Sequence, residues 1–444
     1  MAKAGGPLLR AAIFVLALAA GGAAFAADSA QAPGWNPFPV RLQRPPAAPL
    51  SMMAELGRRI FHDASLSGSG KQSCASCHDP ANHYGPDGAA PVALGGPGGR
   101  DQGFRAVPSL AYLERQPVFS VGPEADEDEG TTLAQMVARS GGARAAKTAR
   151  NTAQSAGDVV PQGGLFWDGR ADTLQQQAMG PLLNPVEMAN PSVASVAAKL
   201  RAAYAPGFTQ LFGPGVLDNA ALLVGEAMFA VARYQIEDAS FHPYTSKFDY
   251  WLEGRTRFSP AEMRGYLLFN DPARANCGGC HVDQPGRDGL PPRFTDGQFE
   301  ALGAPRNPAL RINRDPKFFD RGICGPYRTD MRADTRFCGM FATPTLRNVA
   351  TRRVFFHNGV FHSLRAVLDF YNDRDVAPGK VYPRAADGSI AKYDDMPPAD
   401  RANVDTIDPP FDRHPGQAPA MSAQDEADII AFLDTLTDGF APER

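Results

Sequence analysis

The feature that most constrains this chain is a pentapeptide, Cys-x-x-Cys-His, that occurs twice, at residues 74–78 (CASCH) and 277–281 (CGGCH). Two thiols at this spacing can add to the two vinyl groups of a haem, and the adjoining imidazole is then held under the iron. A Cys-x-x-Cys pair can also belong to a zinc site, a redox pair or a disulfide. Zinc, however, needs four ligands in one place, and the two pentapeptides are far apart in the chain. The sequence therefore predicts two covalently bound c-type haems, attached through Cys74, Cys77, Cys277 and Cys280, with His78 and His281 as iron ligands.

The N-terminus has the pattern of a secretory signal peptide. Lys3 and Arg10 form a short basic region before an apolar stretch at residues 11–20, and residues 24–26 (AFA) form a small-x-small cleavage signal. An uncleaved membrane anchor is the alternative, but the apolar stretch is shorter than the ~20 residues that span a bilayer. We expect cleavage after Ala26, no membrane segment in the mature protein, and a periplasmic location.

Length and charge limit the remaining possibilities. A chain of 444 residues is long enough for two or three domains, and each half holds one pentapeptide. The net charge of −4, mixed along the chain, argues against a nucleic-acid partner. We expect a signal peptide (1–26), a linker (27–47), an N-terminal haem domain (48–248) with an insert at 119–161, and a C-terminal haem domain (249–444).

The predicted fold class is mainly α, with two class-I cytochrome c-like haem domains and long irregular loops, because glycine and proline concentrate in irregular stretches. A Gly-x-x-x-Phe-x-Asp frame precedes both pentapeptides, at residues 57–63 and 265–271, and each copy predicts a helix that leads into a haem loop. Little in the sequence indicates strands.

Capping signals define two helices in the second half. Ser259, Pro260 and Glu262 predict a helix start by a capping box. Ser422 and Asp425 predict the start of the last helix, whose apolar face consists of Ile429, Ile430, Leu433 and Leu436.

Two further segments look like surface loops. The insert at 119–161 carries an acidic cluster followed by basic residues, which is typical of a solvated loop but would also suit a docking surface. Residues 373–420, rich in Pro, Asp and Gly, are expected to run over the surface. Between them, Cys324 and Cys338 are expected to form a disulfide in an oxidising compartment, with a free catalytic thiol as the alternative.

Four short motifs carry a resemblance to a known family: residues 166–170 (FWDGR), 180–188 (GPLLNPVEM), 343–350 (TPTLRNVA) and 356–359 (FHNG). Together with both pentapeptides, in this order, they resemble the bacterial di-haem cytochrome c peroxidases, a family that includes MauG. The resemblance covers nearly the whole mature chain except the two loop segments.

The resemblance implies a peroxidatic haem in the N-terminal half. Glu187 matches the family's distal acid–base residue, Gln177 the polar residue beside it, and Trp167 the tryptophan that relays electrons between the two haems. Taken without the motifs, Glu187 would be read as a surface charge and Trp167 as a core aromatic. A carboxylate partly buried over a haem can have its pKa raised toward the task of moving a proton between the two oxygens of peroxide.

At the second haem the chain follows the MauG-like members. The peroxidases place a Met opposite the second pentapeptide His, and here that position is Tyr371. A phenolate is a hard anionic donor that stabilises oxidised iron, whereas a thioether favours ferrous iron. The alternative is that Tyr371 only packs on a helix while Met340 or Met331 reaches the iron.

The chain also departs from the pattern of peroxidases that need reductive activation. Their loop after the first pentapeptide carries a His that caps the peroxidatic haem, where this sequence has Leu94 before a glycine-rich stretch at 95–99. We therefore expect the first haem to be open at rest, and His83 to have a loop role. The family's calcium site uses an Asn before a Pro, where residues 106–108 read AVP, so calcium is doubtful.

Three functions remain in view. The first is a MauG-like enzyme that uses hydrogen peroxide to oxidise a protein or aromatic substrate. The second is a peroxidase that detoxifies hydrogen peroxide with electrons from a small periplasmic cytochrome or copper protein. The third, a non-catalytic electron carrier, would need both irons six-coordinate and no acid–base group above either haem.

Overall fold

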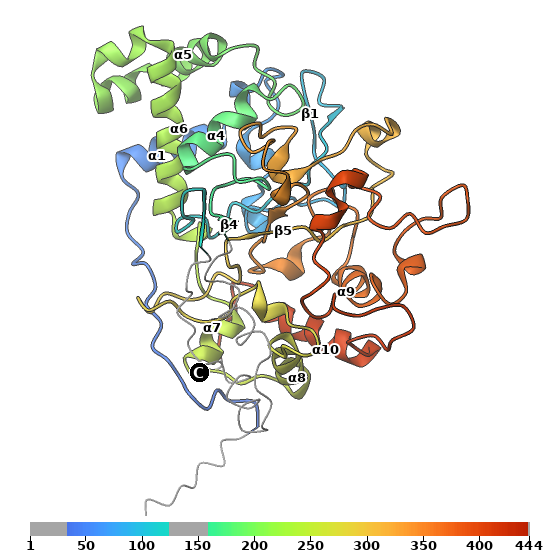
Figure 1. Cartoon of the computed structure of the whole chain (residues 1–444). Coiled ribbons are helices and arrows are strands. Elements are labelled where there is room, and N and C mark those ends of the chain that lie inside the picture. The colour runs from blue at the N-terminus through green and yellow to red at the C-terminus, as the bar shows by residue number, and fades with distance from the viewer. Residues whose placement is uncertain (1–32, 124–158, 443–444) are drawn as a thin grey trace, which may run out of the picture.

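The computed structural model describes residues 33–123 and 159–442. The predicted signal peptide and most of the 119–161 insert lie outside these ranges. The described chain is mainly helical, as predicted, and its long loops join two helical groups, one around α1 and α6 and the other around α8 and α10 (Figure 1).

The α-helices are α1 (Met52–Phe61), α4 (Leu174–Leu183), α5 (Val193–Phe212), α6 (Ala220–Glu237), α7 (Lys247–Leu252), α8 (Pro260–Phe269), α9 (Leu364–Asp373) and α10 (Ala423–Asp434). The strands are β1 (Leu94–Gly95), β2 (Asp101–Gln102), β3 (Ser120–Pro123), β4 (Val159–Gln162), β5 (Phe299–Glu300) and β6 (Phe341–Ala342). Each pentapeptide begins as a short 3-10 turn, Cys74–Ser76 and Cys277–Gly279.

The repeated Gly-x-x-x-Phe-x-Asp frame marks a helix crossing in each half. A Cβ on Gly57 of α1 would lie 1.9 Å from the carbonyl oxygen of Ala230 on α6, and a Cβ on Gly265 of α8 would lie 1.9 Å from that of Asp428 on α10. No side chain fits at such an approach, so glycine is required at both positions. The repeat therefore encodes a close helix pair beside each pentapeptide.

The capping predictions in the second half are confirmed. Ser259 and Glu262 form a capping box at the start of α8, and Ser422 and Asp425 form another at the start of α10. Of the predicted apolar face of the last helix, Ile429 and Leu433 are buried, Ile430 is partly buried, and Leu436 is buried just beyond the helix end.

Two hydrophobic clusters occupy the two halves. The first gathers α1, α5 and α6, and the second gathers α7, α8, α9 and α10. Phe248 of α7 and Leu42 of the linker both belong to the second cluster. The linker is also bound there by backbone hydrogen bonds, from Val40 to Leu252 and from Gln43 to Gly289.

The sequence missed the strands. Three two-stranded antiparallel pairs form among the described residues: β1–β2, β3–β4 and β5–β6. The β3–β4 pair joins Ser120 to Gln162, so the two ends of the insert are bound to each other. Backbone pairing between residues far apart in the chain leaves no local pattern in two- to four-residue segments, which is why it escaped notice.

The expectation for residues 373–420 was wrong. Tyr382, Met396, Val404 and Phe411 of this segment are buried, and Asn358 donates a 2.8 Å hydrogen bond to Asp395. The segment thus covers the second half instead of running over the surface. Its buried apolar residues are scattered among Pro, Asp and Gly, so the composition concealed them.

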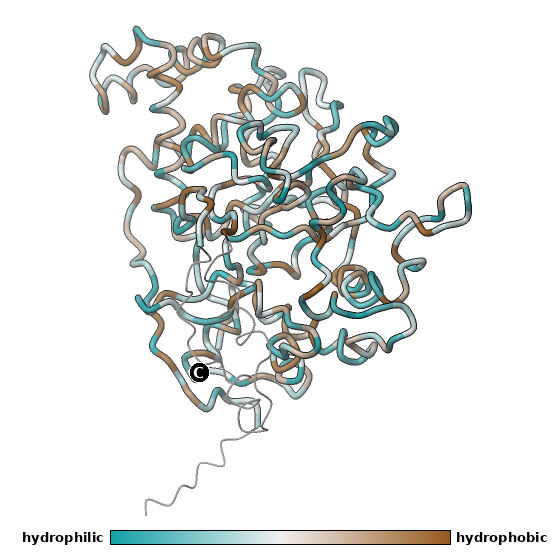
Figure 2. The backbone as a smooth tube through the Cα atoms, viewed as in Figure 1, coloured by the Kyte–Doolittle hydropathy of each residue, from teal (hydrophilic) through white to brown (hydrophobic). Residues whose placement is uncertain are grey.

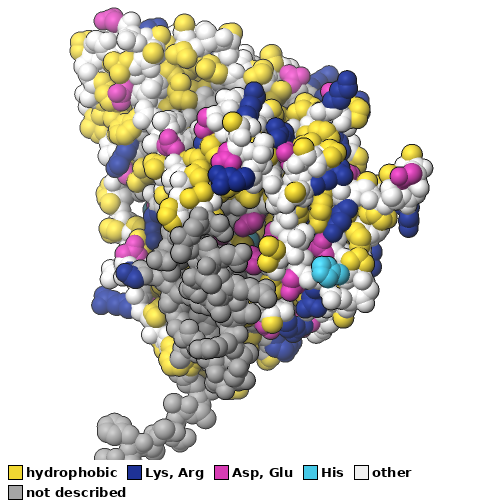
Figure 3. All heavy atoms as spheres, in the orientation of Figure 1, with side chains coloured by type: hydrophobic (Ala, Val, Ile, Leu, Met, Phe, Trp, Pro, Cys, Tyr) yellow, Lys and Arg dark blue, Asp and Glu magenta, His cyan; other side chains and the backbone are white. Residues whose placement is uncertain are grey.

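The remaining expectations concern membrane segments, the charge of the surface and the disulfide. Within residues 33–123 and 159–442 no helix is both long and apolar enough to cross a bilayer, and hydrophobic residues occur in short stretches along the backbone (Figure 2). On the face seen in Figure 3, acidic and basic side chains are interspersed and hydrophobic ones gather over α5. Cys324 and Cys338 form the predicted disulfide.

Candidate active site

The two pentapeptide histidines are held alike by backbone carbonyl groups. Nδ1 of His78 lies 3.3 Å from the carbonyl oxygen of Tyr84, and Nδ1 of His281 lies 3.0 Å from that of Phe294. A carbonyl oxygen can only accept, so Nδ1 donates in both rings and Nε2 carries the lone pair that a metal needs. Burial lowers the pKa of each imidazole to about 4, although the carbonyl hydrogen bonds oppose it, so both rings are neutral at pH 7. We call their surroundings the first and the second centre.

The pentapeptide thiols suit thioether attachment. None of the four cysteines, all within the described residues, forms a disulfide. Burial raises the pKa of Cys74 and Cys277 to about 12 and that of Cys77 to about 11, so these side chains are neutral thiols at pH 7. The described residues also contain no group of three or more His, Cys, Asp or Glu that could hold a metal ion. The donor set of each centre fits a covalently held haem.

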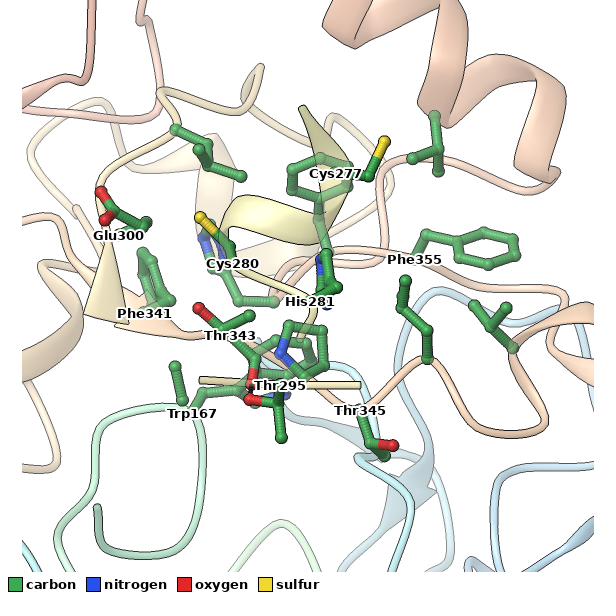
Figure 4. A pocket seen from close by; sticks show the side chains of 18 of the residues that line it. Trp167, Cys277, Cys280, His281, Thr295, Glu300, Phe341, Thr343, Thr345 and Phe355 are labelled. Atoms are coloured by element: carbon green, nitrogen blue, oxygen red, sulfur yellow. Dashed lines mark hydrogen bonds between the residues drawn. The ribbon is translucent and has the colours of Figure 1, made fainter. Parts of the chain in front are cut away.

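A large cavity opens at the second centre and extends toward the first half. Figure 4 shows His281, Cys280 and Trp167 among the side chains that line it, and Tyr371 and Gln177 line it as well. One cavity is therefore lined by the second pentapeptide, by Tyr371, the predicted second iron ligand, and by Trp167, the predicted relay.

Tyr371 lies on α9, which begins with Ser363 as N-cap. Its ring stacks on Phe411 with centroids 5.1 Å apart, and the guanidinium of Arg374 lies 3.6 Å from the centroid of Phe411. Burial raises the pKa of Tyr371, the nearby Cys280 adds to this, and Arg374 opposes it. The phenol is thus near the pentapeptide and beside a buried cation that favours its ionised form. Its role as iron ligand stays a prediction.

The alternative methionines lie elsewhere. Met331 and Met340 pack near Ile323 in a separate cluster, and neither is among the residues that line the cavity. Met396 and Met421 do line it, although the sequence had not suggested them. Met396 escaped notice because it belongs to the segment that was expected to be a surface loop.

Glu187 lies in the turn after α4, near the first pentapeptide. The pKa of Cys77 is raised first by burial and next by the negative charge of the Glu187 carboxylate, which shows that the two side chains are close. Asn184 donates a short hydrogen bond to Oε1 of Glu187. Burial raises the pKa of Glu187, whereas Arg170 and the hydrogen bond from Asn184 lower it. A carboxyl with these opposed influences is suited to gain and lose a proton.

The glycine-rich loop after the first pentapeptide passes over the Glu187 turn. Gly96 donates a 2.8 Å hydrogen bond from its backbone nitrogen to the carbonyl of Glu187, and a Cβ on Gly95 would lie 2.3 Å from the carbonyl oxygen of Val186. Leu94, which stands where the resemblance would place a capping His, is 43% exposed. Glycine is therefore required at position 95, because a side chain there would collide with the backbone of this turn.

The FWDGR motif has a structural basis. Nε1 of Trp167 donates a 2.8 Å hydrogen bond to the carbonyl of Ala106. The next residue, Asp168, is fully buried and accepts 2.7 Å and 2.8 Å hydrogen bonds from Arg105 and Arg170. The guanidinium of Arg170 lies 3.5 Å from the centroid of the Phe166 ring. The indole of Trp167 is thus fixed by its own hydrogen bond, and its sequence neighbours Phe166 and Asp168 are fixed by arginine contacts.

Gln177, the predicted polar residue beside Glu187, lies on the helix that precedes it. Its side chain, 6% exposed, lies on α4 and lines the cavity shared with Trp167. In the part of the chain that the structure describes, no hydrogen bond joins Gln177 to Glu187. Its role beside the carboxylate stays a prediction.

The sequence analysis assigned no role to several residues of the site. Arg105 links the first half to the second through Asp320, with hydrogen bonds of 2.7 Å and 2.8 Å. His357 of the FHNG motif stacks on Phe341 at 3.5 Å, and its Nε2 lies 3.4 Å from Asp395. Each of these contacts joins residues far apart in the chain, so no local pattern predicts it. Of the residues involved, only His357 stands in a recognisable motif.

Comparisons with known proteins agree with this geometry. A profile of the family described as di-haem cytochrome c peroxidase matches residues 51–257. The methylamine utilization protein MauG of Paracoccus denitrificans is 33% identical over 404 residues, which are 87% of this chain and 88% of the relative. The cytochrome c551 peroxidase of Nitrosomonas europaea is 27% identical over 357 residues, covering 78% and 80%.

A solved structure shows the same architecture. The crystal structure of the di-haem peroxidase BthA from Burkholderia thailandensis superposes with a TM-score of 0.73 at 35% identity, over 90% of this chain and 89% of that one. With two haem-attachment pentapeptides, two matching histidine geometries and these relatives, the chain belongs to the bacterial di-haem cytochrome c peroxidase family that includes MauG, and it is a peroxidase-like oxidoreductase with two c-type haems.

Proposed function

We propose that this enzyme reduces hydrogen peroxide at the first centre, while the second centre stores or relays electrons. The observation that carries the proposal is the contrast between the centres: a buried carboxyl, Glu187, lies by the first pentapeptide, and a buried phenol, Tyr371, by the second. The haem iron supplies the redox chemistry when bound. Reduction of hydrogen peroxide to two waters consumes two electrons and two protons, which a substrate and solvent must provide.

Glu187 supplies the proton transfer. Its carboxylate accepts a proton from one oxygen of hydrogen peroxide and returns it to the other, so that the second oxygen leaves as water. Asn184 holds the carboxylate by donating to Oε1, and Arg170 favours its ionised form. Both neighbours keep the group able to act as a base although it is buried.

Trp167 connects the centres. It lines the cavity of the second centre, and its indole is anchored on Ala106, in the segment between the first pentapeptide and the insert. An indole is large and oxidisable, and here it is fixed at both the side chain and the backbone, since Ala342 donates a 3.0 Å hydrogen bond to the carbonyl of Trp167. These contacts support a relay role.

The substrate we propose is a protein or another aromatic compound, oxidised in the MauG-like manner. Tyr371 favours this over the detoxifying role, because a phenolate ligand stabilises oxidised iron. The alternative, a peroxidase that takes electrons from a small cytochrome or copper protein, is favoured by the similarity to the Nitrosomonas europaea peroxidase. Steady-state peroxide consumption with a reduced c-type cytochrome separates the two, since the MauG-like enzyme should turn over poorly.

Replacing Trp167 by Phe tests the coupling of the centres. In the wild type, one equivalent of hydrogen peroxide added to the diferric protein should change the absorption of both haems in stopped-flow measurements. In W167F the response of the second haem should slow by roughly tenfold, which corresponds to ~1.4 kcal/mol of added barrier.

The matched control is Trp251→Phe, which changes a buried tryptophan that lies outside the cavity lining and donates to Gly34. Unchanged kinetics at both haems in W167F, or equal slowing in the control, would rule out the relay.

Location and domain organisation complete the proposal. We place the enzyme in the periplasm, delivered by the leader at 1–26 and acting without a membrane segment. We divide the chain into a peroxidatic and an electron-transfer haem domain. The boundary fits better just before α7 than between residues 248 and 249, because α7 packs in the second cluster.

A further inference from the structure

Arg352 is a half-buried cation with no acidic partner among the described residues. It follows the 3-10 turn Val349–Thr351, and its side chain lines the cavity between the two centres. Nη2 donates a 2.8 Å hydrogen bond to the carbonyl of Val107. Across residues 33–123 and 159–442, no carboxylate forms an ion pair with this guanidinium.

Three arginines with buried side chains each have an acidic partner, unlike Arg352. Arg347 binds Asp249 through two hydrogen bonds of 2.9 Å and 2.8 Å, Arg105 binds Asp320, and Arg374 binds Asp375. Acidic partners raise the pKa of Arg347 and Arg105, whereas burial alone lowers the pKa of Arg352 to about 10.

A guanidinium that is partly withdrawn from water and has no counter-charge is costly, because a hydrogen bond to a neutral carbonyl replaces only part of the lost hydration. The neighbours of Arg352 place its guanidinium close to the first centre. Nη1 lies 3.5 Å from the point where a Cβ on Gly85 would be, so the guanidinium is next to the chain that follows the first pentapeptide.

Gly85 follows Tyr84, whose carbonyl accepts from His78, and Arg352 contributes to the lowered pKa of that histidine. The cation therefore lies beside the first centre while it faces the cavity of the second.

Each haem carries two propionate carboxylates, and arginine is the side chain best suited to bind a carboxylate through paired hydrogen bonds. We propose that Arg352 binds a haem propionate in the space between the two centres and supplies its counter-charge. The inference rests on the two haems of the proposed function, but not on the reaction with peroxide.

The test uses the holoenzyme and two variants of Arg352. A positive charge near a haem favours the ferrous state, so R352Q should lower the midpoint potential of the haem whose propionate is bound. We expect about a tenfold shift of the ferric-to-ferrous ratio at fixed potential, equal to about 59 mV for one electron. Separate titration of each haem by its absorption identifies which of the two provides the propionate.

The second readout is the carboxylate stretching region of the redox-induced infrared difference spectrum. R352Q and R352K should both shift a propionate band, because both lose the paired hydrogen bonds, whereas R352K should keep the potential near that of the wild type. The control is R353Q, which removes the same charge from the exposed neighbouring residue. Haem content is checked by the pyridine haemochrome assay.

Wild-type infrared bands in both Arg352 variants would overturn the proposal, as would equal potential shifts in R352Q and R353Q. If R352Q loses a haem, R352K decides the question through its infrared bands. None of these readouts requires peroxide, so a failure here is distinct from a failure of the peroxidase function.

Discussion

Replacing Tyr371 by Met is expected to raise the midpoint potential of the second haem by roughly 0.2 V, within the ~0.8 V range that axial ligands cover. The phenolate stabilises ferric iron, whereas a thioether stabilises ferrous iron. A position on α9, with Phe411 stacked on the ring, would place the Met side chain in the same cavity. The measurement is a potentiometric titration followed by the absorption of each haem.

The same variant should gain activity as an ordinary peroxidase. A second haem of higher potential accepts electrons from a reduced cytochrome more readily, so steady-state peroxide consumption with that donor should rise. The matched control is Tyr382→Phe, which alters a buried tyrosine that donates to Gly303 and does not itself line the cavity. An unchanged second-haem potential in Y371M would exclude Tyr371 as the iron ligand.

Glu187→Gln is expected to slow the reaction of the diferric enzyme with hydrogen peroxide by about 10²–10⁴-fold, the range for loss of a general acid–base group. The amide keeps the size of the side chain but cannot accept the peroxide proton. The second-order rate constant is measured by stopped-flow absorption. Glu226→Gln on α6, in the same half and without an ion pair in the described residues, serves as the control.

The pH dependence gives an independent check of Glu187. Burial raises its pKa above the ordinary 4.5, and the ionised form is the one that accepts the proton. The wild-type rate should therefore fall as the pH is lowered through this raised pKa, and the inflection should lie above pH 4.5. In E187Q this dependence should disappear. An E187Q rate equal to that of the wild type would assign the proton transfer to another group.

Local signals predicted the parts of the molecule that depend on neighbouring residues. The capping boxes of α8 and α10 need residues three positions apart, and each pentapeptide holds its thiols and imidazole within five residues. The disulfide followed from the count of cysteines left after the pentapeptides. The family motifs also pointed to Glu187 and Trp167, which stand within short conspicuous segments, and to Tyr371, which was located by its distance from the FHNG motif.

The parts that depend on distant contacts could not be predicted. Phe411 stacks on Tyr371, and Met396 lines the cavity, but both belong to a segment whose composition is typical of a surface loop. That Arg352 binds a neutral carbonyl and no carboxylate of the described residues is visible only once its neighbours are placed. Likewise, Gly57 and Gly265 were noticed as repeats, but their cause is a helix crossing that a single chain segment does not reveal.

The most direct test of the account is the electron paramagnetic resonance spectrum of the resting diferric enzyme. The account predicts one high-spin ferric signal, from a first haem held by His78 with its other face open toward Glu187. It also predicts one low-spin ferric signal of equal intensity, from a second haem held by His281 and Tyr371, and this signal should change in Y371M. Two low-spin signals, neither affected by Y371M, would contradict it.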